Sequence, residues 1–468
     1  MSLFRAGPLL GCALLFAGVP SPGHAAQSAA QWQARQIVAA QKSEAIMQDA
    51  DQRKGLLAQF QVMRYAYASN KDPAFHLIFG QYLSWYQTFV GDYPDASASF
   101  SIKQVPLADD SPSPLSSTDY VARPALEVIP ELAKNAKAVF FNEAHNVPIT
   151  RTLTVQLLTK LRAEGFNYFA AETLYQTDTK LQSRGYPIKG SGFYTEEPIC
   201  AEMVRTALKL GFKVIAYEAL SDATGDARET EQARNIYEQV FKKDPSARLV
   251  LDAGYAHIQK TGTFLNGSSM AEHLHKISGI DPLSVEQTML FPHQSSDDDH
   301  PYYAPVMQKL QPKEPIVFVD KSGKPWSLRP GYDVSVFFPP QQLLRSRPTW
   351  LSLGGLRVPY FIAGERCNRS YPCLVQARYA DESADAIPAD RLVLDPVPLN
   401  TVLYEHINNG HTAPSSELYL RPGKYKLTFV AEDAGLLYQQ DITVGEQPTA
   451  DAPPAQPGPS QTVPTQQP

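Results

Sequence analysis

Four apolar runs in the middle of the chain each end in an acidic residue, and stretches with helical spacing separate them. The runs are Ala138–Glu143, Tyr168–Glu172, Val214–Glu218 and Leu249–Asp252. Apolar runs that alternate with helical patterns predict strands joined by crossover helices, which pair in parallel. We therefore expect an α/β fold with a mostly parallel sheet in this part of the chain.

The segments between the runs carry helix signals. Pro148 and Pro198 each open a helical pattern, and Gly165 and Gly211 end the two patterns just before the next run. Proline suits the first position of a helix and glycine the position after its end. A third helix is predicted from Ala227 to Lys242. Two later segments, Pro315–Asp320 and Tyr332–Phe338, are predicted strands.

Two of the four acidic strand ends also carry a histidine. His145 follows Glu143 by two residues, and His257 follows the last run after Gly254, which lets the backbone approach closely. Parallel strands place their carboxyl ends at one edge of the sheet, where ligands bind. A carboxylate and an imidazole at this spacing can hold a divalent metal together, or act as a base with its orienting partner. The pattern predicts an acidic, histidine-bearing pocket at that edge.

Composition divides the chain into five predicted segments. They are a signal peptide at 1–25, a helical region and linker at 26–124, an α/β domain at 125–338, a β-sandwich-like domain at 339–445 and a disordered tail at 446–468. The N-terminal region is rich in aromatic residues, which we expect to pack against the α/β core. Short alternating apolar runs follow Pro339, and the tail is rich in Pro, Gln and Thr.

The N-terminus predicts export. Arg5 precedes about a dozen mostly apolar residues, and Ala25 and Ala26 offer a cleavage point, as in a bacterial secretory signal. A lipoprotein signal at Cys12 is the less favoured alternative. The expected location is the periplasm or the medium, where Cys367 and Cys373 could form a disulfide; Cys200 is expected to be a buried thiol.

Charge and motif content exclude several classes. The 468 residues carry a net charge of −6, with no basic region for nucleic acid, and 43% of them are hydrophobic. No later segment is long and apolar enough for a membrane span. Gly-x-Ser-x-Gly, His-Glu-x-x-His, Walker and Gly-x-Gly-x-x-Gly motifs are missing. His273 and His275 lie two apart on a predicted helix, so we expect surface positions for both.

The order of the short motifs resembles that of the erythromycin esterase / Tiki / ChaN-like superfamily. The motifs are Asn142–His145, Phe169–Glu172, Ala227–Ile236, Gly254–His257 and Met270–Leu274, within about 125–290. The superfamily includes hydrolases that use glutamate and histidine, metal-dependent membrane-anchored proteases and a haem-binding lipoprotein. Many members begin the first motif with glycine, where this chain has Asn142.

The resemblance implies a set of site residues: Glu143, His145, Glu172, Arg228, Glu229 and His257. The expected function is an exported hydrolase acting on an ester or amide bond of a small molecule or peptide. One of the two histidines would activate water, and Arg228 would stabilise negative charge. Glu143 and Glu172 would orient a histidine, or would hold zinc, manganese or cobalt together with His145 and His257.

Two alternatives remain open. The chain could be a non-catalytic periplasmic binder of haem or metal, with Tyr217 or Tyr255 as a haem ligand. It could also be a cell-envelope interaction protein whose β domain binds the partner.

Overall fold

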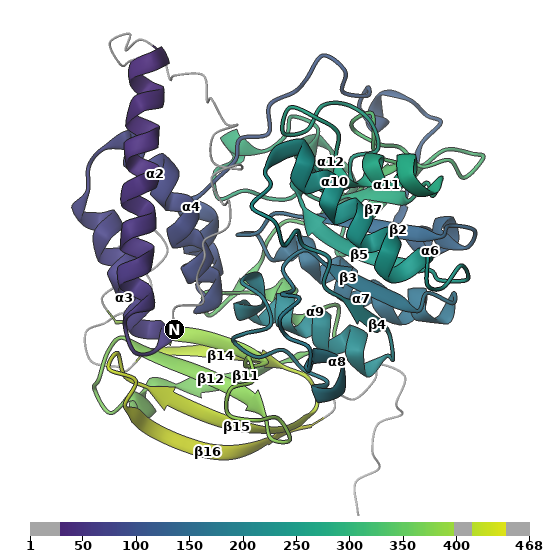
Figure 1. Cartoon of the computed structure of the whole chain (residues 1–468). Helices are drawn as coiled ribbons and strands as arrows, with labels where there is room; N and C mark the ends of the chain where they lie inside the picture. The colour runs from purple at the N-terminus through teal and green to yellow at the C-terminus, as the bar shows by residue number, and fades with distance from the viewer. Residues whose placement is uncertain (1–28, 397–413, 446–468) are drawn as a thin grey trace, which may run out of the picture.

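The computed structural model describes residues 29–396 and 414–445 of the chain. The predicted signal peptide, with its lipoprotein alternative at Cys12, and the predicted tail at 446–468 lie outside these residues. Figure 1 shows three parts: N-terminal helices, a central sheet flanked by helices, and antiparallel strands from the C-terminal part. The α/β fold with a preceding helical region and following antiparallel sheets is confirmed.

The central sheet has six parallel strands in the order β4-β3-β5-β2-β6-β8. Their bounds are β2 Ala138–Glu143, β3 Tyr168–Ala171, β4 Lys213–Ile215, β5 Leu249–Gly254, β6 Leu283–Glu286 and β8 Val334–Ser335. The four runs that the sequence singles out form four consecutive strands of the sheet, in the order β4, β3, β5 and β2. Strand β6 has no continuous apolar run, which explains why its sequence does not predict it.

Helices cover both faces of this sheet. They are α6 Ala125–Ala133, α7 Ile149–Ala163, α9 Pro198–Lys209, α10 Gly225–Ile236 and α11 Met270–Ser278. Helix α12, Tyr303–Leu310, packs in a separate core with Phe318 and Trp326, and α8, Leu181–Arg184, is a single turn. Val139 and Phe141 of β2 pack in a core with α6, α7 and α9, whereas Phe140 packs in a second core with α10 and α11. Successive strand residues point to opposite faces, so both faces must be apolar, as the continuous runs indicate.

The third predicted helix changes type near its end. Helix α10 ends at Ile236, and the turn of π-helix η3, Tyr237–Phe241, continues it. The helix therefore covers nearly the predicted range. Its N-terminal half carries the acidic and basic side chains that reach the sheet edge.

One pair of strands differs from the sequence-based expectation. β1, Val121–Pro124, lies in the stretch predicted as linker, and it pairs antiparallel with β7, Ile316–Val319, apart from the parallel sheet. The apolar pattern of β7 predicts a strand but does not identify its partner, which lies almost two hundred residues earlier in the chain.

The C-terminal part consists of antiparallel strands. A four-stranded sheet has the order β13-β12-β15-β16, and β11 pairs with β14. The bounds are β11 Val358–Ala363, β12 Cys373–Tyr379, β13 Asp390–Leu394, β14 Ser415–Leu420, β15 Gly423–Val430 and β16 Leu436–Val444, preceded by the short pair β9 Leu343–Leu344 and β10 Arg347–Pro348. Cys367 and Cys373 form the expected disulfide, and Cys200 is a buried thiol, also as expected.

The N-terminal helices pack on both other parts. They are α2 Ala29–Asp51, α3 Leu56–Ser69, α4 Pro73–Phe89 and α5 Tyr93–Ser99. Trp85 and Phe89 contact Phe193 of the central part edge-on, with centroids 5.3 and 5.4 Å apart, so the aromatic side chains form a packing surface as predicted. Arg64 of α3 pairs with Asp395 at 2.7 Å, which ties the helices to the C-terminal part.

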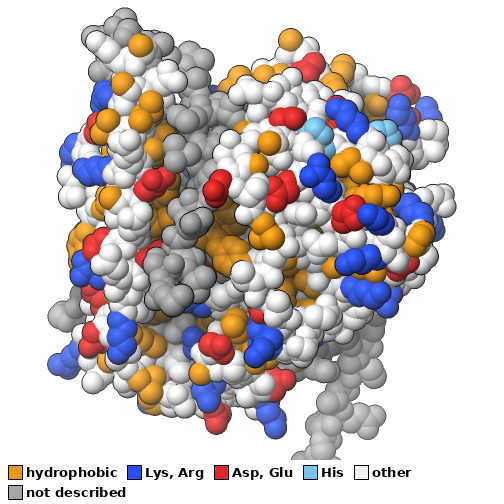
Figure 2. Space-filling view, in the orientation of Figure 1, with side chains coloured by type: hydrophobic (Ala, Val, Ile, Leu, Met, Phe, Trp, Pro, Cys, Tyr) orange, Lys and Arg blue, Asp and Glu red, His pale blue; other side chains and the backbone are white. Residues whose placement is uncertain are grey.

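The surface agrees with the composition. Figure 2 shows acidic and basic side chains interspersed over the visible face, without an extended basic patch. Within the ranges 29–396 and 414–445, no helix combines the length and apolar character that crossing a bilayer requires.

Candidate functional site

The carboxyl ends of β2, β3 and β5 bring the predicted residues together. Glu143 ends β2 and lies beside Gly254, which ends β5. Glu172 directly follows β3, and its backbone N–H donates to the carbonyl of Asp252 at 3.0 Å, which continues the β3–β5 ladder. His145 and His257 follow two of these strand ends. Residues more than a hundred positions apart therefore meet at one edge of the sheet.

The first group of side chains surrounds Glu143. Nδ1 of His145 lies 2.8 Å from Glu143 Oε1. The guanidinium of Arg151, on α7, donates to both carboxylate oxygens, from Nη2 at 2.7 Å and from Nε, and also donates to the carbonyl of His145 at 3.2 Å. Arg151 is itself held by Glu197, 3.3 Å away. The imidazole is thus oriented by a carboxylate that a buried arginine fixes in place.

Glu143 is ionised in this environment. Burial acts to raise its pKa, but Arg151 and His145 outweigh burial and lower the pKa to about 2. An ionised acceptor at Nδ1 favours the tautomer with hydrogen on Nδ1, which leaves the lone pair on Nε2.

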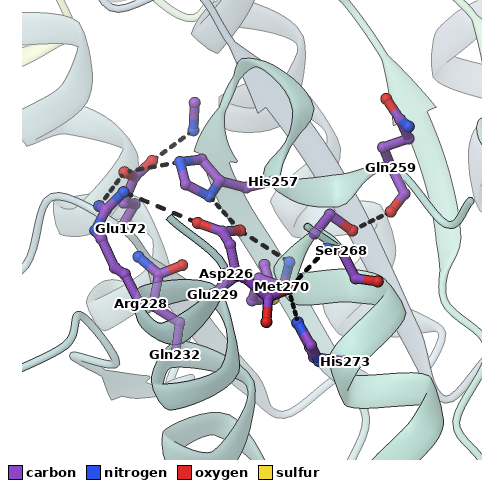
Figure 3. A network of polar contacts seen from close by, with 12 residues as sticks. Glu172, Asp226, Arg228, Glu229, Gln232, His257, Gln259, Ser268, Met270 and His273 are labelled. Carbon is purple, nitrogen blue, oxygen red and sulfur yellow. Dashed lines mark hydrogen bonds and ion pairs between the residues drawn. The ribbon is translucent and has the colours of Figure 1, made fainter. Parts of the chain in front are cut away.

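The second group surrounds His257 and is drawn in Figure 3. Nδ1 of His257 lies 2.8 Å from Oε2 of Glu229, on α10, and Nε2 lies 3.3 Å from Oε1 of Glu172. Arg228, one residue before Glu229, donates to Glu172 at 2.9 Å and to Glu218 at 2.5 Å. Consecutive residues on α10 thus contact opposite sides of the site: the carboxylate orients the imidazole, and the guanidinium holds the facing carboxylate.

His257 carries a positive charge here. Burial alone would lower its pKa, but Glu172 and Glu229 raise it well above the ordinary value. Burial acts to raise the pKa of Glu172, yet His257 and Arg228 bring it well below its usual range. The site therefore combines an ionised carboxylate with an imidazolium and a guanidinium.

Gly254 has no side chain, and this makes room for His145 at the place where the two groups meet. A Cβ on this residue would lie 2.6 Å from His145 Nε2 and 3.2 Å from Glu172 Oε2, and the N–H of Gly254 donates to the same oxygen at 2.7 Å. The backbone is extended at this residue, with φ −68°, so the close approach of His145 explains the glycine. The close approach expected from the sequence is confirmed.

Aromatic rings enclose His145. Tyr194 stacks on the imidazole, with centroids 4.0 Å apart, and Tyr255 meets it edge-on at 5.2 Å. Tyr255 has φ +47°, a backbone conformation that is unfavourable for a residue with a Cβ, and Asn142 Nδ2 donates to its carbonyl at 2.9 Å. Asn142, at the position where many superfamily members have glycine, thus fixes the turn that follows β5.

The structure places two predicted positions differently. Asp252 does not end its strand but lies inside β5, 2% exposed, and burial followed by Glu143 raises the pKa of Asp252 well above its usual range. Its buried carboxyl interacts with Glu143 rather than ending the strand at the sheet edge. His273, predicted at the surface, is partly buried, and its Nε2 lies 2.9 Å from Asp226; His275 is exposed as expected.

Sequence reasoning missed three residues that complete the site. Arg151, Tyr194 and Glu197 come from a helix and from the turn before α9, and none of them follows an apolar strand. Arg151 gives one usable signal, since it shares a helix face with Val155 and Leu158, which are both buried. A charged residue on an apolar face requires a buried partner.

The residues present do not fit a metal held by Glu143, His145, Glu172 and His257. Each of the two carboxylates already faces an arginine, and both ring nitrogens of His257 contact carboxylates. Across the described ranges, no cluster of at least three His, Cys, Asp or Glu side chains has an arrangement that could hold a metal ion. The mechanism below therefore uses no metal.

A haem ligand is also unfavourable at Tyr217. Its side chain is fully buried, and burial raises the pKa of its hydroxyl well above the usual value, which opposes a tyrosinate ligand. Tyr255 is only partly buried, but its ring packs against His145.

Comparisons with known proteins give no family. No family model matches the chain, and no curated protein matches it. Among solved structures, the type III effector HopBA1 aligns over 37% of this chain and 88% of its own, at 11% identity and a TM-score of 0.27. RRSP, a MARTX toxin effector domain from Vibrio vulnificus CMCP6, aligns over 46% of this chain and 50% of its own, at 15% identity and a TM-score of 0.24. At these TM-scores the likeness carries no functional conclusion.

Proposed function

We propose that this chain is an exported hydrolase that cleaves an ester or amide bond at the carboxyl edge of the parallel sheet. The observation that carries the proposal is the contact between Glu143 and His145, in which an arginine-held, ionised carboxylate lies 2.8 Å from Nδ1. Export rests on the predicted signal peptide at 1–25. The resemblance to the erythromycin esterase / Tiki / ChaN-like superfamily agrees with this choice of reaction.

His145 acts as the general base. Its Nε2 accepts a proton from water, and the resulting hydroxide equivalent attacks the carbonyl carbon of the substrate. The C–O or C–N bond to the leaving group then breaks, and the proton on Nε2 passes to the leaving oxygen or nitrogen. Glu143 balances the charge of the imidazolium that forms between these steps.

His257 and Arg228 stabilise the negative charge on the tetrahedral intermediate. Nε2 of His257 is 3.3 Å from Glu172, a long contact, so a substrate oxygen that approaches Nε2 shares this N–H with the carboxylate. Fixed cationic donors in a site with little water stabilise a developing oxyanion strongly. Glu229 keeps His257 charged and oriented throughout.

The substrate enters on the side of Arg228. The histidines are 6% and 2% exposed, whereas the side chains of Arg228 and Glu218 are 17% and 28% exposed. The reacting bond must pass this rim to reach Nε2 of His145. Because both histidines are buried, an extended or small group suits the site better than a bulky one.

The test is turnover of a panel of chromogenic carboxylic esters and peptide amides by the mature protein. For any substrate found, His145→Ala and His257→Ala should lower kcat by about 10²- to 10⁴-fold. His275→Ala, which changes an exposed histidine outside the site, is the matched control and should keep the wild-type rate. Circular dichroism checks that each variant is folded. Equal turnover by His145→Ala and wild type would overturn the proposal.

A further inference from the structure

A second site lies where the three parts of the chain meet. A cavity of about 330 Å³ is bounded by the start of α3, the turn before α9, and strands of the C-terminal sheet. Pockets for small organic ligands usually have volumes of about 300 to 1,000 Å³ and often lie between domains. None of the six residues assigned to the hydrolytic site lines this cavity.

Two arginines on adjacent strands form its polar wall. Arg391 Nε and Arg378 Nη2 both donate to the same amide oxygen, Oε1 of Gln376, at 3.3 and 3.2 Å. Arg378 Nε donates to the carbonyl of Ala386 at 3.1 Å. In the described part of the chain no carboxylate forms an ion pair with Arg378. Arg391 has only a distant one, with Glu196 at 3.7 Å.

Neutral oxygens therefore supply the printed hydrogen bonds to these two guanidiniums, and Glu196, 3.7 Å from Arg391, is the one carboxylate that pairs with either of them in the described part of the chain. Arg391 is 4% exposed, and burial lowers its pKa. Burial and the charge of Arg391 lower the pKa of Arg378 to about 10. Two guanidiniums thus share one amide oxygen, with a single distant carboxylate beside them. A carboxylate or another anion placed between the guanidiniums would form charge-assisted hydrogen bonds with both.

The rest of the wall is mostly apolar. It includes Leu57 of α3, Leu374 of β12, Ile387 and Val430. The start of α3 is pressed against this wall, because a Cβ on Gly55 would come 2.9 Å from the Cβ of Ala434, and Gly55 has φ +88°. An occupant with one anionic group and an apolar body fits both kinds of wall.

The short helix η2, Tyr194–Glu196, joins this cavity to the hydrolytic site. Glu196 lines the cavity, and Arg391 Nη1 donates to its carbonyl at 2.8 Å. At the other end of the same turn, Tyr194 stacks on His145. The next residue, Glu197, pairs with Arg151, which holds Glu143. Residues 194–197 thus connect Arg391 with Tyr194 and Glu143, the two partners of the catalytic imidazole.

We propose that this cavity binds a small organic acid with an apolar body, and that occupancy changes the environment of His145 through η2. Arg378 and Arg391 bind the carboxylate, and the apolar wall takes the body of the ligand. The binding site stands independently of the hydrolysis proposed above, since neither its residues nor its ligand takes part in that reaction.

Isothermal titration calorimetry with octanoate tests the site in the full mature chain. Octanoate should bind one to one and at least tenfold more tightly than acetate or inorganic phosphate, which carry the charge without the apolar body. Absence of octanoate binding, or tighter binding of phosphate, would overturn the assignment. Neither result bears on turnover, so failure here is separate from failure of the hydrolase proposal.

Two variants locate the binding. Gln376→Glu gives the two arginines an internal carboxylate, so it should abolish octanoate binding while the melting temperature stays the same or rises. Gln439→Glu, an exposed position on β16 of the same sheet, is the matched control and should bind as the wild type does. Equal binding by the two variants would contradict the site, and Arg378→Gln should weaken binding at least tenfold.

The link to His145 has its own readout. The NMR signal of the His145 ring, assigned by its loss in His145→Ala, should shift when octanoate binds the wild type and stay fixed in Gln376→Glu. Binding without any shift of this signal would overturn the link.

Discussion

The ring of Tyr194 lies nearly parallel to the imidazole of His145, at 13° between the planes and 4.0 Å between the centroids. The tyrosine comes from the turn before α9, and the histidine follows β2. Glu143 fixes Nδ1 in the ring plane, and the stack fixes the tilt of the ring about that contact. The orientation of Nε2 is therefore determined by two residues from different crossover units.

Removing the stack should slow the reaction. We expect Tyr194→Leu to lower kcat by about tenfold or more, because small misplacements of a catalytic group are costly. Tyr194→Phe keeps an aromatic ring at the position, so its kcat should fall clearly less than that of Tyr194→Leu. Steady-state kinetics on the substrate found in the ester and amide panel measure both. A larger loss in the phenylalanine variant than in the leucine variant would contradict the role of the stack.

The space over Gly254 should not tolerate a methyl group. Gly254→Ala would place a carbon 2.4 Å from His145 Cε1, so the imidazole must move and kcat should fall by at least about tenfold. The displacement should also cost about 1 to 3 kcal/mol of unfolding free energy. Gly190→Ala is the matched control, since a Cβ there meets nothing within 4 Å. Unfolding in urea and kinetics give both quantities; wild-type kinetics in Gly254→Ala would show that His145 Nε2 lies elsewhere.

The charge of His257 predicts a loss of stability at alkaline pH. Its pKa is raised in the folded state, so its contribution is fully present below the unfolded value near 6.5 and disappears as pH rises through the folded pKa. Between these values the unfolding free energy should fall by at most about 1.4 kcal/mol per pH unit. Chemical unfolding from pH 6 to 10 tests this slope. His257→Gln should flatten it, whereas His275→Gln should leave it unchanged; an equal slope in both variants would exclude His257 as the cause.

Chelation should leave hydrolysis intact. Because arginines occupy the carboxylates of Glu143 and Glu172, we expect EDTA dialysis to leave the rate unchanged. Metal analysis of purified protein, wild type beside His257→Ala, provides the check. Zinc, manganese or cobalt near one per chain that the variant loses would instead support the metal set predicted from the sequence.

Local sequence patterns were sufficient for the strands that carry the site. An apolar run that ends in an acid, followed by a helix signal, depends on residues near one another, and all four such runs contribute neighbouring parallel strands. The predicted strand Val214–Glu218 was too long, because β4 ends at Ile215, before Glu218. The prediction that Asp252 ends its strand was wrong, because β5 continues past this residue to Gly254 with the carboxyl group buried. The side chain of Thr154 donates to Asp252, and burial favours its neutral form.

What the sequence could not supply was the identity of distant partners. Arg151 completes the site through a contact with Glu143 that depends on how α7 packs on the sheet. Likewise, β7 has an evident strand pattern, yet its partner β1 is almost two hundred residues away. The cavity between Arg378 and α3 is harder still to predict from sequence, because it forms only after three parts of the chain have packed together.

The packing of the first helices on the last strands determines the order in which the chain can fold. Arg64 binds Asp395, and Arg347 binds Asp390 while also donating to the carbonyl of Gly91. The contacts of Arg64 with Asp395 and of Arg347 with Gly91 span more than 250 residues, so during synthesis the N-terminal helices emerge long before the strands that bury them. Contacts so distant in sequence form slowly. The N-terminal helices can therefore make these contacts only after the last strands have been synthesised, although the helices are made first.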